Sequence, residues 1–316
     1  MTDCDALLAG IVADPLEETR WLVLADWLEE FDDPRRAELL RLHRRMLATC
    51  CEPDAHPERA AWQSRMTELL VAGVRPCVPQ ETLTLPGGVP MTFSFIPPGA
   101  FLMGSEKLSN VEGPVHRVEV RRGFFMGISP VTQAQWFAVM GTDPSHFKGA
   151  VRPVEQVSWN DCQEFCAKLS QLTVRQAELP TEAEWEYTCR GGTTTAYHFG
   201  DLINTDLVNY SGMASHLRSR EGQYREQTTD VGSFSANPWG LFDVHGNVLE
   251  WCADVFGMDT VSTPDYNQEQ LDTYPRVQRG GGWANSSRSC HAASRWGARP
   301  SFLYSTYGFR VCLRLS

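Results

Sequence analysis

Near its end the chain reads RGGGWANSSRSCHAASRWGARPSFLYSTYGFRVCL, from Arg279 to Leu313, and this stretch guides the interpretation of the rest. It begins with a glycine run and a tryptophan and closes on Gly-Phe-Arg-Val, with aromatic residues alternating with Ser, Ala, Arg and Asn between them. Tyrosine and tryptophan supply rigid contact area at a small entropic cost, whereas serine and asparagine adapt their hydrogen bonds. The mixture is typical of a binding surface. The ligand contacts that it predicts are Trp283, Asn285, Arg295, Trp296, Phe302, Tyr304 and Tyr307.

From about residue 81 onward the sequence predicts an α+β domain with much irregular structure. Glycine and proline become frequent, and the apolar runs shorten to strand length at Met91–Ile96 and His116–Val120. Two helices interrupt this texture, because a Ser or Thr is followed three residues later by an acid, which is the spacing of a capping box. The two pairs are Ser158 with Asp161 and Thr181 with Glu184.

Five separated segments, together with the C-terminal stretch, resemble the formylglycine-generating-enzyme (sulfatase-modifying factor) superfamily. In chain order they are IPPGAFLMGS (Ile96–Ser105), SPVTQAQW (Ser129–Trp136), PVEQVSWNDCQEFC (Pro153–Cys166), LPTEAEWEYTCRGG (Leu179–Gly192) and NPWGLFDVHGNVLEWCAD (Asn237–Asp254). The resemblance implies a C-type-lectin-like fold, stabilised by calcium, with a surface pocket near the C-terminal segment.

The same resemblance implies two cysteines that bind copper(I) in the oxidases of this superfamily. Aligned on the glycine run, the first of these positions is Asn285, and only the second is a cysteine, Cys290. Because copper(I) prefers soft thiolate ligands, one thiol beside an amide does not make the two-sulfur site. We therefore expect no copper here and interpret Cys290 as a buried apolar residue, with a residual catalytic role, alone or with His291, as the alternative.

The family's calcium loop falls on Asp243, Gly246, Val248 and Glu250. Calcium takes several oxygen ligands, which a loop of carboxylates and carbonyls can supply. The alternative is that Asp243 caps a turn and Glu250 pairs with an arginine. A second family site would use Asn209, the Tyr210 carbonyl and a later aspartate, which would fall in the divergent stretch near Gln223.

Residues 1–75 predict a small helical domain, with helices over Asp3–Ala13, Leu16–Phe31, Pro34–Leu47 and Pro57–Val71. The string LLAGIVADPLEETRWLVLADWLEEFDDPRRAELLRL (Leu7–Leu42) resembles a repeat-companion helical domain of planctomycete-type multidomain proteins. This second resemblance implies an adaptor that binds a protein partner. We expect a linker over 76–90 and the superfamily domain over 91–316.

Composition narrows the classes of function. The 316-residue chain has a net charge of -11, which argues against nucleic acid or an anionic membrane as the main partner. No apolar run reaches the roughly 18 residues of a membrane span, and the N-terminus lacks a basic signal region. We expect a cytoplasmic protein whose ten cysteines are mostly free thiols.

Three functional interpretations follow. The favoured one is a non-catalytic member of the superfamily that binds a ligand or protein partner through its C-terminal loop surface. One alternative is a copper-dependent oxidase that converts a protein cysteine to formylglycine. The other is a diversified ligand-binding protein of a diversity-generating retroelement, because Ala, Ser, Arg, Phe, Tyr and Thr, the products of adenine mutation, all occur in this stretch.

Overall fold

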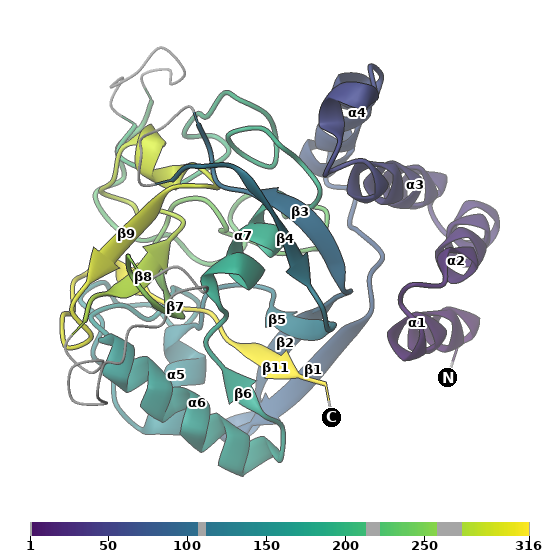
Figure 1. Cartoon of the computed structure of the whole chain (residues 1–316). Coiled ribbons are helices and arrows are strands. Elements are labelled where there is room, and N and C mark those ends of the chain that lie inside the picture. The colour runs from purple at the N-terminus through teal and green to yellow at the C-terminus, as the bar shows by residue number, and fades with distance from the viewer. Residues whose placement is uncertain (1, 107–111, 213–221, 258–273, 316) are drawn as a thin grey trace, which may run out of the picture.

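A computed structural model describes residues 2–106, 112–212, 222–257 and 274–315. Four helices occupy the N-terminal part and lie to one side of a body that contains all the described strands (Figure 1). These helices are α1 (Asp3–Ala13), α2 (Glu18–Phe31), α3 (Pro34–Ala48) and α4 (Arg59–Val71), followed in the body by α5 (Gln133–Met140), α6 (Trp159–Thr173) and α7 (Glu182–Arg190). The α+β class and the helical N-terminal region are confirmed.

Three sheets form the body. The largest has the order β1-β2-β5-β11-β6 and brings the last described strand into its interior. Its members are β1 (Gln80–Leu85), β2 (Val89–Ile96), β5 (Phe124–Gly127), β11 (Cys312–Arg314) and β6 (Ala177–Glu178). A second sheet has the order β10-β7-β8-β9, from Tyr307–Gly308, Leu249–Val255, Arg276–Arg279 and Arg295–Ala298, and β3 (Gly99–Met103) pairs with β4 (His116–Val120).

The predicted helix starts are confirmed at the level of the caps. Ser158 accepts the Asp161 N–H at 3.2 Å, while the Asp161 carboxylate accepts the Ser158 N–H at 2.8 Å. Thr181 and Glu184 form the same reciprocal pair ahead of α7. These bonds satisfy backbone donors that an α-helix leaves unpaired in its first turn, so the local sequence fixes where each helix begins.

The stretch predicted as a linker, 76–90, contains a strand of the largest sheet. β1 pairs with β2 in antiparallel register from Gln80 opposite Ser94 to Leu85 opposite Val89. The alternating exposure along β1 matches a strand with one face on the core. Residues 80–85 are therefore part of the body.

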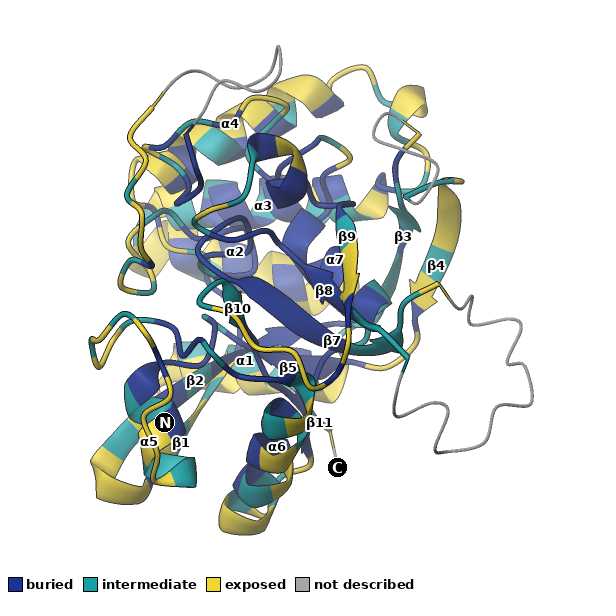
Figure 2. Cartoon of the chain, turned by 90° about the vertical axis from the view of Figure 1, so that its left-hand side faces the viewer, coloured by how far each residue is buried: buried dark blue, intermediate teal, exposed yellow. Residues whose placement is uncertain are grey.

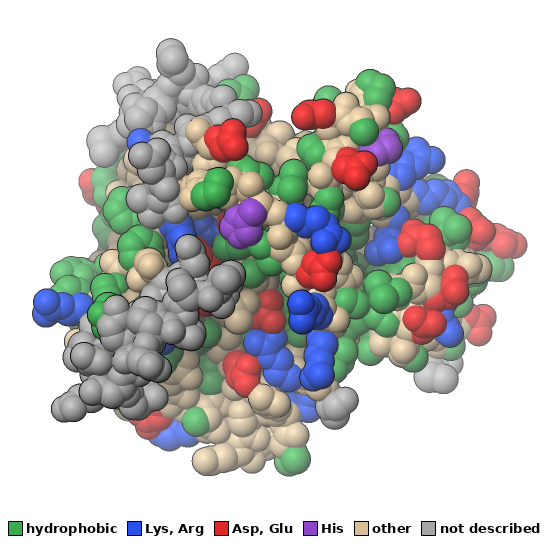
Figure 3. Space-filling view, viewed as in Figure 1, with side chains coloured by type: hydrophobic (Ala, Val, Ile, Leu, Met, Phe, Trp, Pro, Cys, Tyr) green, Lys and Arg blue, Asp and Glu red, His purple; other side chains and the backbone are tan. Residues whose placement is uncertain are grey.

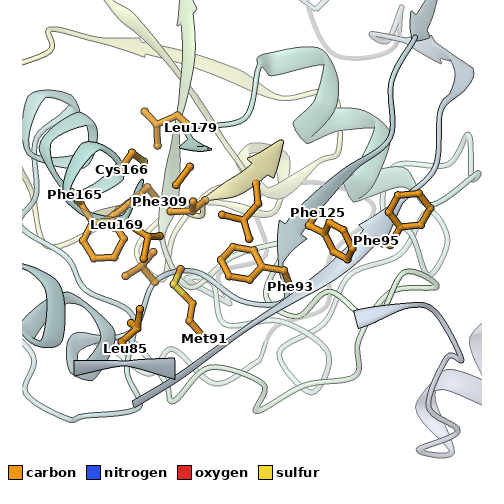
Figure 4. Packing of buried hydrophobic residues seen from close by; sticks show 14 of the residues in the cluster. Leu85, Met91, Phe93, Phe95, Phe125, Phe165, Cys166, Leu169, Leu179 and Phe309 are labelled. Atoms are coloured by element: carbon orange, nitrogen blue, oxygen red, sulfur yellow. The ribbon is translucent and has the colours of Figure 1, made fainter. Parts of the chain in front are cut away.

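The core beneath the largest sheet is rich in phenylalanine (Figure 4). Phe165 of α6 lies 5.2 Å from Phe309, measured between ring centroids, and 5.6 Å from Trp136 of α5. Phe309 is the phenylalanine of the closing Gly-Phe-Arg-Val, and it is completely buried. This end of the C-terminal stretch is therefore held by the core.

The N-terminal helices share a core with the body. Ile11, Leu24 and Leu28 belong to the same apolar cluster as Met91 and Phe93 of β2. On α4, the Arg59 guanidinium donates to the Gly192 carbonyl, and the Gln63 amide donates to the Thr195 hydroxyl at 2.6 Å. The helical region is thus packed against the body by apolar and polar contacts.

Acidic and basic side chains are interspersed on the outer surface of these helices (Figure 3). Many pair with each other, as Arg41 does with Asp26 at 2.7 Å and with Glu29 at 2.6 Å. The arginines of α3 are thus largely engaged within the helical region. Across the described residues, no helix combines the length and apolarity needed to cross a membrane.

Candidate binding surface

The first half of the C-terminal stretch turns sharply and encloses Cys290. Gly280 and Gly281 have φ of 90° and 71°, a region that favours glycine. A Cβ on Gly281 would lie 2.7 Å from the Cys290 sulfur. The thiol packs without exposure in a cluster with Tyr197 and Tyr210, and burial raises its pKa to about 12. Cys290 is therefore a neutral, enclosed thiol at physiological pH.

Asn285, predicted to occupy the position of the family's other cysteine, closes the turn after the glycine run. Its side-chain oxygen accepts the Gly282 N–H at 2.8 Å, and its carbonyl accepts the Ser211 N–H at 3.0 Å. These bonds give the amide a structural role.

His291 does not bond the neighbouring thiol. Its Nδ1 accepts the Ala293 N–H at 3.0 Å, while Cys290 packs among apolar and aromatic side chains. The side chains of Cys290 and His291 are not hydrogen-bonded to each other. This pair therefore lacks the geometry of a nucleophile and its base.

The second half of the stretch is exposed and aromatic. Phe302, Leu303 and Tyr304 are 41%, 48% and 53% exposed, and we call them, with the half-buried Tyr307, the aromatic surface. The ring of Tyr304 lies 5.0 Å from that of Tyr307 and 6.4 Å from that of Phe302. The predicted residues Phe302, Tyr304 and Tyr307 thus come together.

Backbone hydrogen bonds to neighbouring segments hold the loop that carries the aromatic surface. The Tyr304 carbonyl accepts the Gln156 N–H at 3.1 Å and the Tyr307 N–H at 3.0 Å, and the Thr306 carbonyl accepts the Leu249 N–H at 2.7 Å. The exposed rings are therefore carried by an ordered, hydrogen-bonded loop, which lowers the entropic cost of binding.

Trp283 joins this surface through its indole N–H, which donates to the Ser305 carbonyl at 2.9 Å. Its ring lies 5.4 Å from Phe147 and 6.0 Å from Tyr224, nearly parallel to the latter. Phe147 and Tyr224 were not among the predicted contacts, because they come from separate loops and carry no local motif. Leu303 was also missed, since an isolated leucine signals core as readily as surface.

Arg295 and Trp296 lie on β9, the exposed edge of the second sheet (Figure 2). Arg295 donates to the Glu182 carboxylate at 2.5 Å and is directed into a buried ion-pair cluster. Trp296 is 48% exposed. Within the described part of the chain, its ring has no contact with the rings of Phe302 or Tyr304.

One predicted calcium ligand, Glu250, is paired with the guanidinium of Arg310. Both carboxylate oxygens of Glu250 accept from Arg310, at 2.6 and 2.7 Å, and one also accepts from the Trp185 indole. Asp243 Oδ2 accepts the Gly232 N–H at 2.8 Å, whereas its buried Oδ1 has no hydrogen-bond partner in the described part of the chain. Burial raises the pKa of Asp243 to about 6. Asp243 Oδ1 is thus a free oxygen donor, and Glu250 is neutralised by Arg310.

The second predicted calcium site has one donor in a comparable state. Asn209 Oδ1 is buried with no hydrogen-bond partner, while its amide donates to the Gln227 carbonyl at 2.9 Å. Gln223, near which the later aspartate was expected, is exposed. Among the residues that the structure describes, no group of three or more His, Cys, Asp or Glu side chains could hold a metal ion.

Comparisons with known proteins identify the family and the fold. The profile of the sulfatase-modifying factor enzyme 1-like domain matches residues 84–315. The serine/threonine-protein kinase pkn1 of Chlamydia caviae is 30% identical over 247 residues, 68% of this chain and 37% of that protein. The formylglycine-generating enzyme of Mus musculus is 31% identical over 189 residues, 57% of this chain and 49% of the enzyme. The chain therefore spans less than half the length of either relative.

Among solved structures, Treponema denticola variable protein 1 superposes with a TM-score of 0.61 at 27% sequence identity. The match covers 75% of this chain and 99% of that protein. Three quarters of this chain thus share the fold of that protein.

Proposed function

This chain belongs to the family of sulfatase-modifying factor enzyme 1-like domains, and we propose that it is a non-catalytic member. In this proposal it binds a protein or small-ligand partner through the aromatic surface and Trp283. The observation that carries the proposal is the contrast between Cys290, which is enclosed, and Phe302, Leu303 and Tyr304, which are exposed on an ordered loop.

The oxidase alternative is disfavoured by the residues at its two cysteine positions. Copper(I) is held by thiolates, whereas Asn285 supplies an amide engaged in a turn and Cys290 a thiol whose pKa burial raises to about 12. The test is mass spectrometry of a cysteine-containing sulfatase-type peptide after incubation with the folded protein, copper(I) and oxygen. We expect an unchanged peptide, and conversion of its cysteine to an aldehyde that is lost in Cys290→Ser would contradict the proposal.

Exposed aromatic residues favour binding because they bury large areas with few rotatable bonds. Binding energy concentrates in a few such residues at the centre of an interface. The aromatic surface brings three aromatic rings together next to Leu303, with Arg299 over the Phe302 ring at 5.9 Å. Aromatic and arginine side chains together are the composition of binding hot spots.

The binding experiment is a comparative capture from the native cell extract, quantified by mass spectrometry. The bait proteins are the wild type, Phe302→Ala, Tyr304→Ala and the matched control Leu172→Ala, which truncates a leucine that is 51% exposed on α6. We expect one partner to be lost from the two aromatic variants and kept by the control. Its affinity for the purified bait is then measured, and equal affinity for all four proteins would contradict the proposed surface.

A second candidate function is supported by the likeness to Treponema denticola variable protein 1. In this second proposal, a retroelement diversifies the C-terminal stretch of this chain, and the chain is one of many binding variants. Sequencing the DNA around the gene tests this idea. A nearby copy of the last segment that differs mainly at adenines would support it, and a locus without such a copy would remove it.

We also propose a structural calcium ion held by Asp243, the carbonyls of Gly246 and Val248, and Glu250. The support is the buried Asp243 Oδ1, which lacks a hydrogen-bond partner, since calcium takes carboxylate and carbonyl oxygens. Thermal denaturation in calcium and in chelator is the test, with magnesium as the control ion. A melting temperature that calcium raises in the wild type but not in Asp243→Ala would support the site, and identical curves would exclude it.

The partner of the helical region is a further part of the proposal. Its likeness to repeat-companion domains suggests an adaptor that binds a protein. We also propose, from the sequence alone, that the protein is cytoplasmic. The test is a binding assay with the full chain in which an exposed α2 residue is replaced, as in Phe31→Ala. Partners lost in this variant are counted separately from partners lost in variants of the aromatic surface.

A further inference from the structure

A hollow of about 230 Å³ lies at the seam between the N-terminal region and the body. Pro53, from the turn between α3 and α4, lies on its wall together with Leu102 of β3 and Val115. Arg190, at the end of α7, and the buried His291 also line it. We call this the seam pocket. Ligand pockets in proteins favour such junctions, with apolar walls and a few polar groups that converge.

Arg190 is a fixed positive charge in the pocket wall, and it is 4% exposed. Its Nε donates to Glu186 at 2.8 Å and its Nη2 to the Gly104 carbonyl at 2.9 Å. The acceptor of Nη1 is the Thr195 carbonyl at 3.4 Å, which is long for a hydrogen bond. A guanidinium has five N–H donors, so Nη1 keeps donor capacity for a ligand.

His291 is a fixed neutral donor. Because its Nδ1 accepts the Ala293 N–H at 3.0 Å, the ring proton lies on Nε2. Burial, with Arg190 nearby, lowers the pKa of His291 to about 3, so the ring stays uncharged across the physiological range. Among the residues that the structure describes, Nε2 has no hydrogen-bond partner. The arginine and the histidine thus offer two donors to the pocket.

Two exposed lining residues, which we call the rim, carry carboxylates instead of hydrogen-bond donors. Asp201 and Glu106 are exposed, and Asp201 is oriented by its Oδ1, which accepts the Ala196 N–H at 3.0 Å. A group bound between the wall and the rim therefore meets hydrogen-bond donors at one end and carboxylates at the other.

We propose that the seam pocket binds a free α-amino acid. The carboxylate of the ligand accepts from Arg190 and His291, its ammonium group faces Asp201 and Glu106, and its side chain lies against Pro53, Leu102 and Val115. A zwitterion matches this polarity, whereas an amine or a carboxylic acid alone leaves one end unpaired. The site is separate from the aromatic surface and does not depend on the function proposed for it.

The experiment is isothermal titration calorimetry of the full chain with each of the common L-amino acids. For every amino acid that binds, the amide that lacks the carboxylate and the N-acetyl derivative that lacks the ammonium are titrated as well. We expect at least one amino acid to bind, and both derivatives to bind at least tenfold more weakly. If no amino acid binds to the folded protein at millimolar concentration, or if the derivatives bind as well as the parent, the proposal is overturned.

Variants then locate the site. His291→Asn retains an acceptor for the Ala293 N–H but shortens the side chain, and Asp201→Asn with Glu106→Gln removes the rim charges. We expect each to weaken binding at least tenfold, while the control Asp206→Asn, a nearby exposed acid outside the pocket, leaves it unchanged. Because the rim variant changes only exposed side chains, it decides the outcome even where the histidine variant fails to fold. Unchanged affinity in the rim variant contradicts the assignment.

Discussion

The two halves of the C-terminal stretch have opposite environments although they are adjacent in sequence. In the first half, Arg279 to Ser294, the side chains of Arg279, Cys290 and Ser294 are almost completely buried and the turns are closed by hydrogen bonds. In the second half, Arg295 to Tyr307, apolar rings face solvent. The first half therefore forms a closed framework around Cys290, while the second half presents large apolar side chains outward. We therefore expect stability to depend on the first half and binding on the second.

The largest expected effect is on stability, from Arg279→Met in the first half. Arg279 has no exposure, pairs with Glu186 and donates to the Ser294 carbonyl at 2.7 Å. Removing one partner of a buried ion pair leaves an uncompensated charge and costs about 3–5 kcal/mol. Urea unfolding of the variant should show this loss in the free energy of unfolding.

The matched control in the second half is Arg299→Met. Arg299 is exposed, so its replacement should change the free energy of unfolding by no more than about 0.5 kcal/mol. Equal losses in the two variants would abolish the proposed contrast between the halves.

A second effect concerns a carboxyl group beneath the aromatic surface. Glu155 is completely buried, its Oε1 accepts the Phe147 N–H at 2.7 Å, and its Oε2 has no partner. Burial raises its pKa from 4.5 to about 7, against the smaller lowering effects of backbone hydrogen bonds and Lys148. The folded state therefore binds a proton more tightly than the unfolded state, and stability falls as pH rises from 4.5 to 7.

Glu155→Gln should remove this pH dependence, because glutamine keeps an acceptor for the Phe147 N–H and does not ionise. Relative to the wild type, the variant should gain about 3 kcal/mol of stability between pH 4.5 and 7, the linkage value of such a pKa shift. Chemical denaturation at a series of pH values measures it, with the exposed Glu30→Gln as control. A constant difference across that range would refute the assignment.

The third effect separates binding from stability. Phe302→Ala and Tyr304→Ala should each weaken partner affinity by about 2 kcal/mol, roughly thirtyfold, as expected for hot-spot residues. Their free energy of unfolding should fall by less than about 1 kcal/mol, because the side chains are about half exposed. A loss of about 3–5 kcal/mol in stability would instead identify them as core residues.

The smallest expected effect is at Cys290. Because its thiol is enclosed and its pKa is raised to about 12, iodoacetamide should leave it unmodified in the native protein and alkylate it only after unfolding. Peptide mass spectrometry locates the label, and the half-buried Cys51 provides the comparison within the same chain. Rapid native labelling of Cys290 would reopen the case for thiol chemistry.

Local patterns allowed much of the fold to be predicted. The capping boxes at Ser158 and Thr181 appear where expected, because the bonds that make them lie within four residues. The four N-terminal helices were also predicted, with ends shifted by up to two residues. The strand over Gln80–Leu85 was missed because its short alternating pattern resembles a linker until β2 pairs with it.

The candidate surface was predicted less completely. Phe302, Tyr304, Tyr307 and Trp283 come together as the sequence suggested, but Arg295 is directed to Glu182. Phe147 and Tyr224 complete the surroundings of Trp283 from loops that are distant in sequence. A contact between such loops depends on the whole chain packing, so a local pattern does not reveal it.

The sequence by itself determined the family and the helix starts, because each is written in residue identities at short spacing. Only the tertiary structure decided that Cys290 is enclosed, that Arg310 neutralises Glu250, and that Pro53 and His291 line one pocket. These features depend on burial and on charges brought together from distant segments. Desolvation and pairing are properties of the packed molecule, and they set whether a thiol reacts, a carboxylate is free or a histidine donates.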